Sequence, residues 1–103
     1  MMALRANTEP SGQLSDEILA SRIAQGDASA LEVLYDRYAA MVLGIAFKIL
    51  DDRALAENLL QEIFWQVWQS ASMYRPESGS FMGWLFRTAR QLAMDAQAQR
   101  VRS

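Results

Sequence analysis

The sequence predicts a single all-α domain, a compact four-helix fold with a short polar loop between the third and fourth helices. The chain of 103 residues is 51% hydrophobic and has only 5 glycines and 2 prolines, which favours helices over a turn-rich β fold. Apolar residues recur at three- and four-residue steps, most clearly in 54–74. Helix-capping residues stand where three of these periodic segments begin.

Composition also limits the possible functions. The absence of cysteine excludes disulfides and thiolate metal sites, and the absence of histidine removes the commonest general base and metal ligand. No nucleophile stands beside a base, and no glycine-rich phosphate loop follows a strand. No apolar run is long enough to span a membrane, and the start does not resemble a signal peptide. We therefore expect a soluble, cytoplasmic, non-enzymatic protein without metal, cofactor or membrane insertion.

The first segment, 1–14, shows no periodicity and is expected to be a flexible tail, with the folded domain covering 15–103. Ser15 is suited to cap a short first helix. Asp16 and Glu17 then fall in its first turn, where negative charge is favourable, and Gly26 is a suitable stop.

A second helix is expected from its cap at Asp27 to about Leu50. Asp51, Asp52 and Arg53 interrupt the pattern before the third helix, so the two helices should form an antiparallel hairpin with a short connection. The second helix has a continuous apolar stripe: Leu31, Leu34, Tyr35, Tyr38, Met41, Val42, Ile45 and Ile49.

The third helix, within 54–74, has one broad apolar face and one polar face. The apolar face consists of Leu55, Leu59, Leu60, Ile63, Phe64, Val67, Trp68 and Ala71. The opposite side gathers Glu57, Asn58, Gln61, Glu62 and Trp65. Two interpretations of Trp65 are open: a partly covered surface tryptophan, or the anchor of a docking stripe for another protein.

The wheel of the third helix also predicts the centre of the core. Leu60, Phe64 and Trp68 should pack there against the second helix. Their expected partners are Tyr38, Val42 and Ile45.

A non-helical segment follows Tyr74, because proline removes a backbone donor and glycine permits turn geometry. Its residues are Arg75, Pro76, Glu77, Ser78, Gly79 and Ser80. Ser80 is suited to cap a last helix, whose inner face should consist of Phe81, Leu85, Thr88, Ala89, Leu92 and Ala96. The opposite face of that helix gathers Arg87, Arg90, Met94 and Gln97. Such a face is either a solvated surface or a binding surface for an anion.

Charge is divided unevenly along the chain. Residues 1–73 hold five basic and ten acidic side chains, a net charge of −5, whereas 74–103 hold five arginines and two acidic side chains, a net charge of +3. An anionic partner should therefore meet the C-terminal third.

Three segments together resemble a known family: LYDRY (34–38), AENLLQEIFWQVW (56–68) and YRPESGSFMGWLFRTARQLAMD (74–95). They are similar to region 2 of bacterial sigma factors, most of all those of the extracytoplasmic-function (ECF) group. The resemblance implies a σ2 domain of four helices. It further implies that the third helix docks on the β′ clamp helices of RNA polymerase, that the loop and fourth helix recognise and melt the −10 promoter element on the non-template single strand, and that an anti-sigma factor is a partner.

The resemblance also implies roles for individual residues. Asn58, Gln61 and Glu62 fall on core-binding positions, flanked by Glu57 and Trp65, although Asn58 stands where such proteins usually have aspartate. The loop 75–80 corresponds to the base-capturing loop, and Trp84, Arg87 and Arg90 fall on conserved positions of the following helix. Gln91 replaces the usual asparagine, so sequence preference does not transfer, and Met94 shares this face.

The physical chemistry suits promoter melting. A protein that extrudes a base offsets the cost with a shaped pocket and with stacking worth ~1–3 kcal/mol per base. The polar loop should supply backbone donors, and Tyr74 and Phe81 at its borders should supply stacking surfaces. The alternative for Phe81 and Trp84 is that both close the core over the helix ends.

Two further expectations concern the whole chain. Family members continue into a second helical domain that reads the −35 element, so we expect this chain to be a fragment. The alternative function is a free-standing helical interaction module, or an adaptor that binds polymerase without reading DNA.

Overall fold

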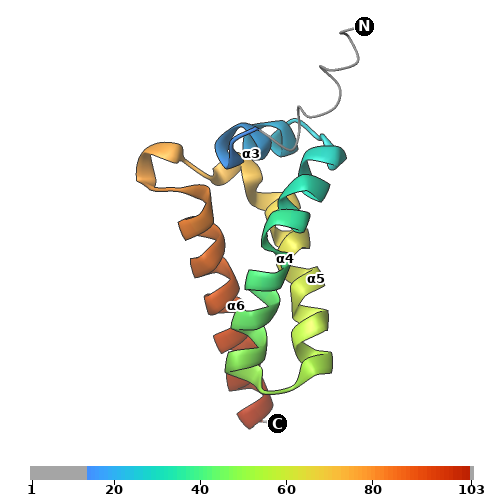
Figure 1. The fold of residues 1–103 in the computed structure, drawn as a ribbon. Coiled ribbons are helices and arrows are strands. Elements are labelled where there is room, and N and C mark those ends of the chain that lie inside the picture. Colours follow the sequence, from blue (N-terminus) through green and yellow to red (C-terminus); the bar gives the residue numbers. More distant parts are fainter. Residues whose placement is uncertain (1–13, 103) are drawn as a thin grey trace, which may run out of the picture.

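The computed structural model describes residues 14–102, and the predicted all-α fold is confirmed there (Figure 1). The helices are α3 (Asp16–Ala24), α4 (Ala28–Leu50), α5 (Arg53–Ser70) and α6 (Phe81–Arg102), with two short 3₁₀ turns, η1 (Ala71–Met73) and η2 (Pro76–Ser78), between α5 and α6. The expected tail lies outside the described residues except for Leu14. The third helix is shorter than predicted, because its last turn tightens into η1.

Three predicted caps are confirmed. Ser15 Oγ accepts the N–H of Ile18 at 3.2 Å, and Ser80 Oγ accepts the N–H of Gly83 at 3.0 Å. The carboxylate of Asp27 caps α4 in the same way. These short polar side chains satisfy donors that the first turn of a helix leaves without an intrahelical acceptor. Local chemistry therefore fixes where α3, α4 and α6 begin.

Two aspartates make the turn between α4 and α5. Asp51 adopts a left-handed conformation with φ of 52°, and its N–H donates to the carbonyl oxygen of Phe47 at 2.7 Å. Asp52 Oδ1 then accepts the N–H of Leu55 at 3.0 Å and caps α5. Aspartate tolerates the left-handed region better than most residues. The predicted antiparallel hairpin is thus closed by a two-residue connection.

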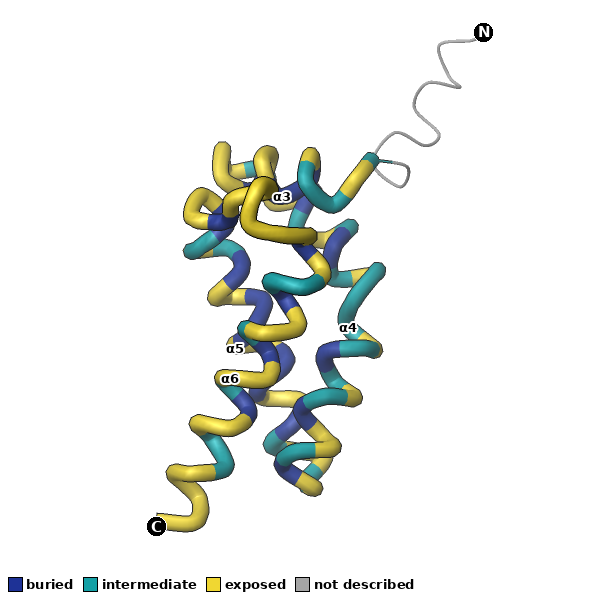
Figure 2. Tube along the Cα trace, turned by 90° about the vertical axis from the view of Figure 1, so that its left-hand side faces the viewer, coloured by how far each residue is buried: buried dark blue, intermediate teal, exposed yellow. Residues whose placement is uncertain are grey.

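The three long helices lie side by side, and α3 crosses one end of them (Figure 1). The hairpin of α4 and α5 turns at the end far from α3, and α6 packs against both of its helices. The segment 75–80 lies near α3, so it belongs to the opposite end of the molecule from the hairpin turn and the C-terminus. Figure 2 shows exposed residues along most of the length of α6.

The core draws on all four helices. Its largest fully buried side chains are Phe81, Leu19, Leu34, Ile63, Leu85, Val42 and Val67. Alanines fill the places where helices approach closely, with Ala46, Ala56, Ala89 and Ala93 all fully buried. A sequence analysis that looks for large apolar residues does not identify these alanines as core residues.

The buried face of α5 is centred on different residues from those predicted. Leu60 and Phe64 are buried, but Trp68 is only partly buried, whereas Ile63 and Val67 are completely covered. Because α4 and α6 pack against α5 together, the middle of its buried arc lies between them rather than directly under α4. Phe64 meets the ring of Tyr35 edge-on, with ring centroids 5.0 Å apart.

Polar contacts tie α3 to α4. Asp16 forms an ion pair with Arg37 at 2.7 Å and accepts a hydrogen bond from the hydroxyl of Tyr38. Arg37 Nη2 also donates to the carbonyl oxygen of Leu14 at 2.6 Å. Leu14, assigned from the sequence to the tail, thus packs on the domain. These contacts fix the position of α3 over one end of the bundle.

Candidate polymerase and nucleic-acid interfaces

The first candidate interface is the α5 stripe, which we define as Glu57, Asn58, Gln61, Glu62 and Trp65. All five side chains are exposed, and Trp65 keeps 58% of its surface accessible. Glu57 pairs with Arg53 at 2.9 Å, but both side chains are largely exposed, so this pair contributes little to stability. The stripe is available to a partner.

Trp65 continues into an apolar groove rather than standing alone. The groove has a volume of about 350 Å³ and runs between α4 and α5, lined by Leu31, Glu32, Tyr35, Gln61, Phe64 and Trp65. Leu31 and Tyr35 belong to the apolar stripe expected on the second helix, and they are only partly buried. Periodicity identifies an apolar face but cannot tell how much of it a neighbouring helix covers. The stripe therefore has an apolar pocket beside its aromatic residue.

The other side of the α5 stripe borders a second groove. This groove has a volume of about 340 Å³, and α4, α5 and α6 contribute Leu50, Leu55, Asn58, Leu59, Glu62, Ala96, Gln99 and Arg100. Asn58 and Glu62 face this groove, whereas Gln61 and Trp65 face the first. The stripe is thus a ridge with a hollow on each side.

The second candidate interface begins with the 75–80 loop. All six of its residues are exposed. Gly79 has φ of 137°, a conformation that other residues rarely adopt. The N–H groups of Ser78 and Gly79 donate to the carbonyl oxygens of Arg75 and Pro76 at 2.9 and 3.2 Å, so two of the expected backbone donors are used within the loop. The loop is an internally bonded turn.

The prediction that Tyr74 and Phe81 present stacking surfaces is wrong. Tyr74 is only 8% exposed and Phe81 is fully buried. Their rings pack at right angles with centroids 5.7 Å apart, and Phe81 also lies 5.5 Å from Trp84. Aromatic pairs at these separations stabilise one another. The alternative, that Phe81 and Trp84 close the core over the helix ends, agrees with this cluster.

Glu17 was missed as part of this interface. One carboxylate oxygen, Oε2, lies 3.3 Å from both the Tyr74 hydroxyl and the backbone nitrogen of Phe81. The Tyr74 hydroxyl lies 2.8 Å from the carbonyl oxygen of Gly79. Burial, followed by the negative charge of Glu17, raises the pKa of the Tyr74 hydroxyl. Local sequence gives no signal for contacts across more than fifty residues.

Helix α6 presents the remaining predicted side chains. Arg87, Arg90, Gln91 and Met94 are all exposed on it. The Gln91 amide donates to Asp95 Oδ1 at 3.0 Å, so one polar group of this face is already paired with a carboxylate. The guanidinium of Arg87 extends toward the start of α6, since its Nη1 would lie 3.5 Å from a Cβ added to Gly83. Arg87 therefore lies on the loop side of the helix.

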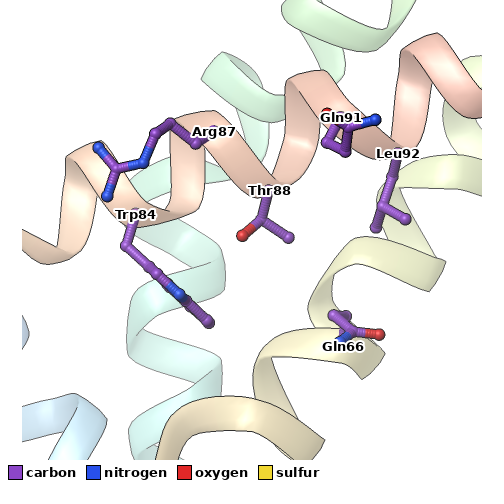
Figure 3. Close-up of a pocket in the computed structure, with 6 residues that line it drawn as sticks. All are labelled: Gln66, Trp84, Arg87, Thr88, Gln91 and Leu92. Atoms are coloured by element: carbon purple, nitrogen blue, oxygen red, sulfur yellow. The ribbon is translucent and has the colours of Figure 1, made fainter. Parts of the chain in front are cut away.

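A groove of about 410 Å³ separates this face of α6 from α5. In Figure 3, Trp84, Thr88 and Leu92 point from α6 toward Gln66 of α5, while Arg87 and Gln91 lie along the opposite edge. Trp84 and Leu92 thus give the groove apolar surface, and Arg87 and Gln91 line one polar edge.

Two exposed apolar residues of α6 were also missed. Met82 and Phe86 keep 48% and 45% of their surface exposed. With Arg90 and Met94 they follow a spacing of four residues, which places all four on one side of α6. That spacing was readable in the sequence. Tyr74 and Phe81, which flank the loop, expose little apolar surface, whereas Met82 and Phe86 expose it on this side of the helix.

Comparison with known proteins identifies the family of the chain. Residues 34–103 match the family model described as Sigma-70 region 2. The chain is 39% identical over 87 residues to the ECF RNA polymerase sigma factor SigK of Mycobacterium sp. strain KMS, which covers 84% of this chain and 43% of the relative. The SigK proteins of Mycobacterium ulcerans and Mycobacterium tuberculosis strain H37Ra are 35% identical over 89 residues and 34% identical over 79 residues. These matches cover 85% and 77% of this chain and 48% and 42% of the relatives.

The chain belongs to the sigma-70 region 2 family, and the resemblance to the ECF group is confirmed. It spans less than half the length of the curated relatives given above. No solved structure matches it significantly. Within residues 14–102, none of the helices has the length and hydrophobicity needed to cross a bilayer.

Proposed function

We propose that this chain is the polymerase-binding and promoter-melting module of a transcription initiation factor. The observation that carries the proposal is exposure: all fifteen residues that the resemblance and the helical wheels assign to interfaces are accessible, while the intervening faces of α5 and α6 form the core. A sigma-type module needs two such surfaces on one rigid body, one for polymerase and one for DNA.

The α5 stripe is the proposed contact for the clamp helices of the β′ subunit. Gln61 and Trp65 border an apolar groove, and an aromatic side chain beside a pocket, surrounded by polar residues, is the usual composition of an interface anchor. Asn58 and Glu62 supply polar contacts on the other side of the ridge. Because Asn58 has no charge, it gives an ordinary hydrogen bond where aspartate would give a charge-assisted one.

The 75–80 loop and α6 are the proposed contacts for the non-template strand of the −10 element. The loop would enclose an extruded base, and Arg87 and Arg90 would hold phosphates. Phe86 and Met82 replace the buried Tyr74 and Phe81 as the surface on which a base can stack. The proposed site of action is the cytoplasm, and an anti-sigma factor would act by covering one of these two surfaces.

The test is fluorescence anisotropy with single-stranded oligonucleotides that vary in base identity, using the domain alone and bound to core polymerase. We expect a base preference in the polymerase-bound state. Binding to polymerase without any base preference would instead support the adaptor function.

A further inference from the structure

Two contacts to Glu17 connect both ends of the 75–80 loop to a different helix. Tyr74 immediately precedes the loop and Phe81 immediately follows it, and both approach the same oxygen of Glu17 at 3.3 Å. The Tyr74 hydroxyl also reaches across the base of the loop to the carbonyl oxygen of Gly79 at 2.8 Å. One carboxylate of α3 therefore holds the two ends of the loop at a fixed separation.

The loop has few other constraints. Its six residues are exposed, and the guanidinium of Arg75 donates to the carbonyl oxygen of Ser72 at 3.5 Å. The internal turn bonds set local curvature, but they do not set how the turn is oriented on the domain. Orientation is decided at the two ends, where Tyr74 and Phe81 pack into the core and Glu17 bonds to both.

The helix that carries Glu17 is held independently of the loop. The neighbouring Asp16 is bonded to Arg37 and Tyr38 of α4, and Leu19, Ala20 and Ile23 anchor α3 in the core. A carboxylate carried by a helix fixed in this way can impose a geometry on the two ends of the loop. The single proton of the Tyr74 hydroxyl can satisfy only one acceptor fully, so the shorter contact to Gly79 is its main bond and Glu17 is its second acceptor.

From this geometry we propose that Glu17 is a positioning residue for base recognition: it orients the 75–80 loop for an extruded base without touching DNA. The inference rests on the proposed function of the loop. It assigns to the short first helix a part in sequence selectivity.

The domain offers a matched control for this idea. Glu17 and Tyr74 form one carboxylate–tyrosine pair on α3, and Asp16 and Tyr38 form another. Both pairs fasten α3, but only the first touches the ends of the loop. A general loss of α3 docking would appear in both sets of variants.

The first measurement is hydrogen exchange of the backbone amides of 75–81. Glu17→Gln keeps one acceptor oxygen but removes the charge, so both contacts lose their charge-assisted character, and Tyr74→Phe removes the hydroxyl. We expect both to accelerate exchange in this segment about tenfold, as follows from losing a hydrogen bond to a charged group. Asp16→Asn and Tyr38→Phe should leave exchange there unchanged. Unchanged exchange in Glu17→Gln, or equal acceleration in the Asp16→Asn control, would overturn the proposal whatever the loop binds.

The second measurement is base discrimination by the polymerase-bound variants, well below the melting temperature of each. Glu17→Gln and Tyr74→Phe should each reduce the ratio of affinities for the best and worst base about tenfold, and the double variant should be no worse than either alone. Affinity for polymerase should not change. If exchange accelerates but discrimination stays at the wild-type value, Glu17 has no part in recognition. A wild-type domain without discrimination contradicts the proposed function instead.

Discussion

The guanidinium of Arg100, near the end of α6, donates a hydrogen bond to the backbone carbonyl oxygen of Leu50, the last residue of α4, at 2.6 Å. A second contact at 3.2 Å joins it to the side-chain oxygen of Gln97. A positive side chain at a helix C-terminus satisfies a free carbonyl and interacts favourably with the helix dipole. Arg100 thus closes the end of the bundle opposite the 75–80 loop.

This contact limits how many cations can meet a strand bound at the loop. Of the five C-terminal arginines, Arg100 is occupied at the far end and Arg102 lies beyond it, which leaves Arg75, Arg87 and Arg90. With ~0.7 counterion released per contact, we expect a log–log salt slope of about −2 for single-stranded DNA. Anisotropy titrations over a range of salt concentrations measure it. Arg100→Ala should leave the slope unchanged, and a slope that fell in this variant would place Arg100 on the DNA.

Substitutions on α6 should change affinity for DNA, whereas substitutions in the loop should change base preference. Arg87→Ala should weaken binding to all oligonucleotides by a similar factor and make the slope shallower by about 0.7, because phosphate contacts position a strand without reading it. Ser78→Ala should alter base preference, because the loop is the proposed enclosure for the base. Anisotropy across a set of single-base variants separates the two effects. A uniform loss in the loop variant would contradict base recognition there.

Trp65→Ala should weaken binding to core polymerase by about 2 kcal/mol or more, the cost of truncating an interface anchor. Its melting temperature should change little, because 58% of the side chain is already exposed. Gln69→Ala, at another exposed position of α5, is the control and should retain affinity. Equilibrium binding and thermal unfolding together provide the measurement. Unfolding of the Trp65 variant would assign that residue to the core.

The position of the core can be tested with two aromatic residues of α5. Phe64→Ala should cost ~3–5 kcal/mol of unfolding free energy, because the ring is buried and packed on Tyr35. Trp68→Ala should cost less despite the larger side chain, since Trp68 is only partly buried. Urea denaturation gives both values. A larger cost for Trp68→Ala than for Phe64→Ala would support the core centre predicted from the helical wheel.

Alkaline pH should destabilise the domain through Tyr38. Burial, and then the hydrogen bond to Asp16 and its charge, raises the pKa of the Tyr38 hydroxyl to about 12, against 10.0 for a free tyrosine. Because the folded state holds the proton more tightly, this stabilisation is complete below pH 10 and is lost as pH rises toward 12. Urea midpoints should fall over this interval, and Tyr38→Phe should reduce the fall. Equal pH dependence in the variant would exclude Tyr38 as a cause.

The sequence alone predicted those features that depend on residues close to one another in a single helix. Ser15, Asp27 and Ser80 were recognised as caps because a cap bonds residues two or three positions ahead. Trp65 was placed on the exposed side of its helix because a 3.6-residue period defines that side. The covering of α5 by α4 and α6 together was not readable, so Ile63 and Val67 were not recognised as the middle of the buried arc.

The errors at the candidate site have the same origin. Glu17 was assigned only a favourable charge at a helix start, because its partners follow 57 and 64 residues later. Tyr74 and Phe81 were expected to supply stacking surfaces because they border a polar turn, yet they pack together and against Trp84. Arg100 was counted only as one of the charges of the basic C-terminal third, because its contact with Leu50 joins residues 50 positions apart.

The separation of Glu17 from its partners also bears on the order in which the domain assembles. The α4–α5 hairpin forms through nearby contacts across a two-residue turn, and closing such a short connection costs little chain entropy. The junction of α3 with the loop ends must enclose 57 or more residues before it gains any bond. We therefore expect the hairpin to nucleate folding and the loop to acquire its final shape last. By the same reasoning, we expect the contacts of the loop to open before those of the hairpin in native-state fluctuations.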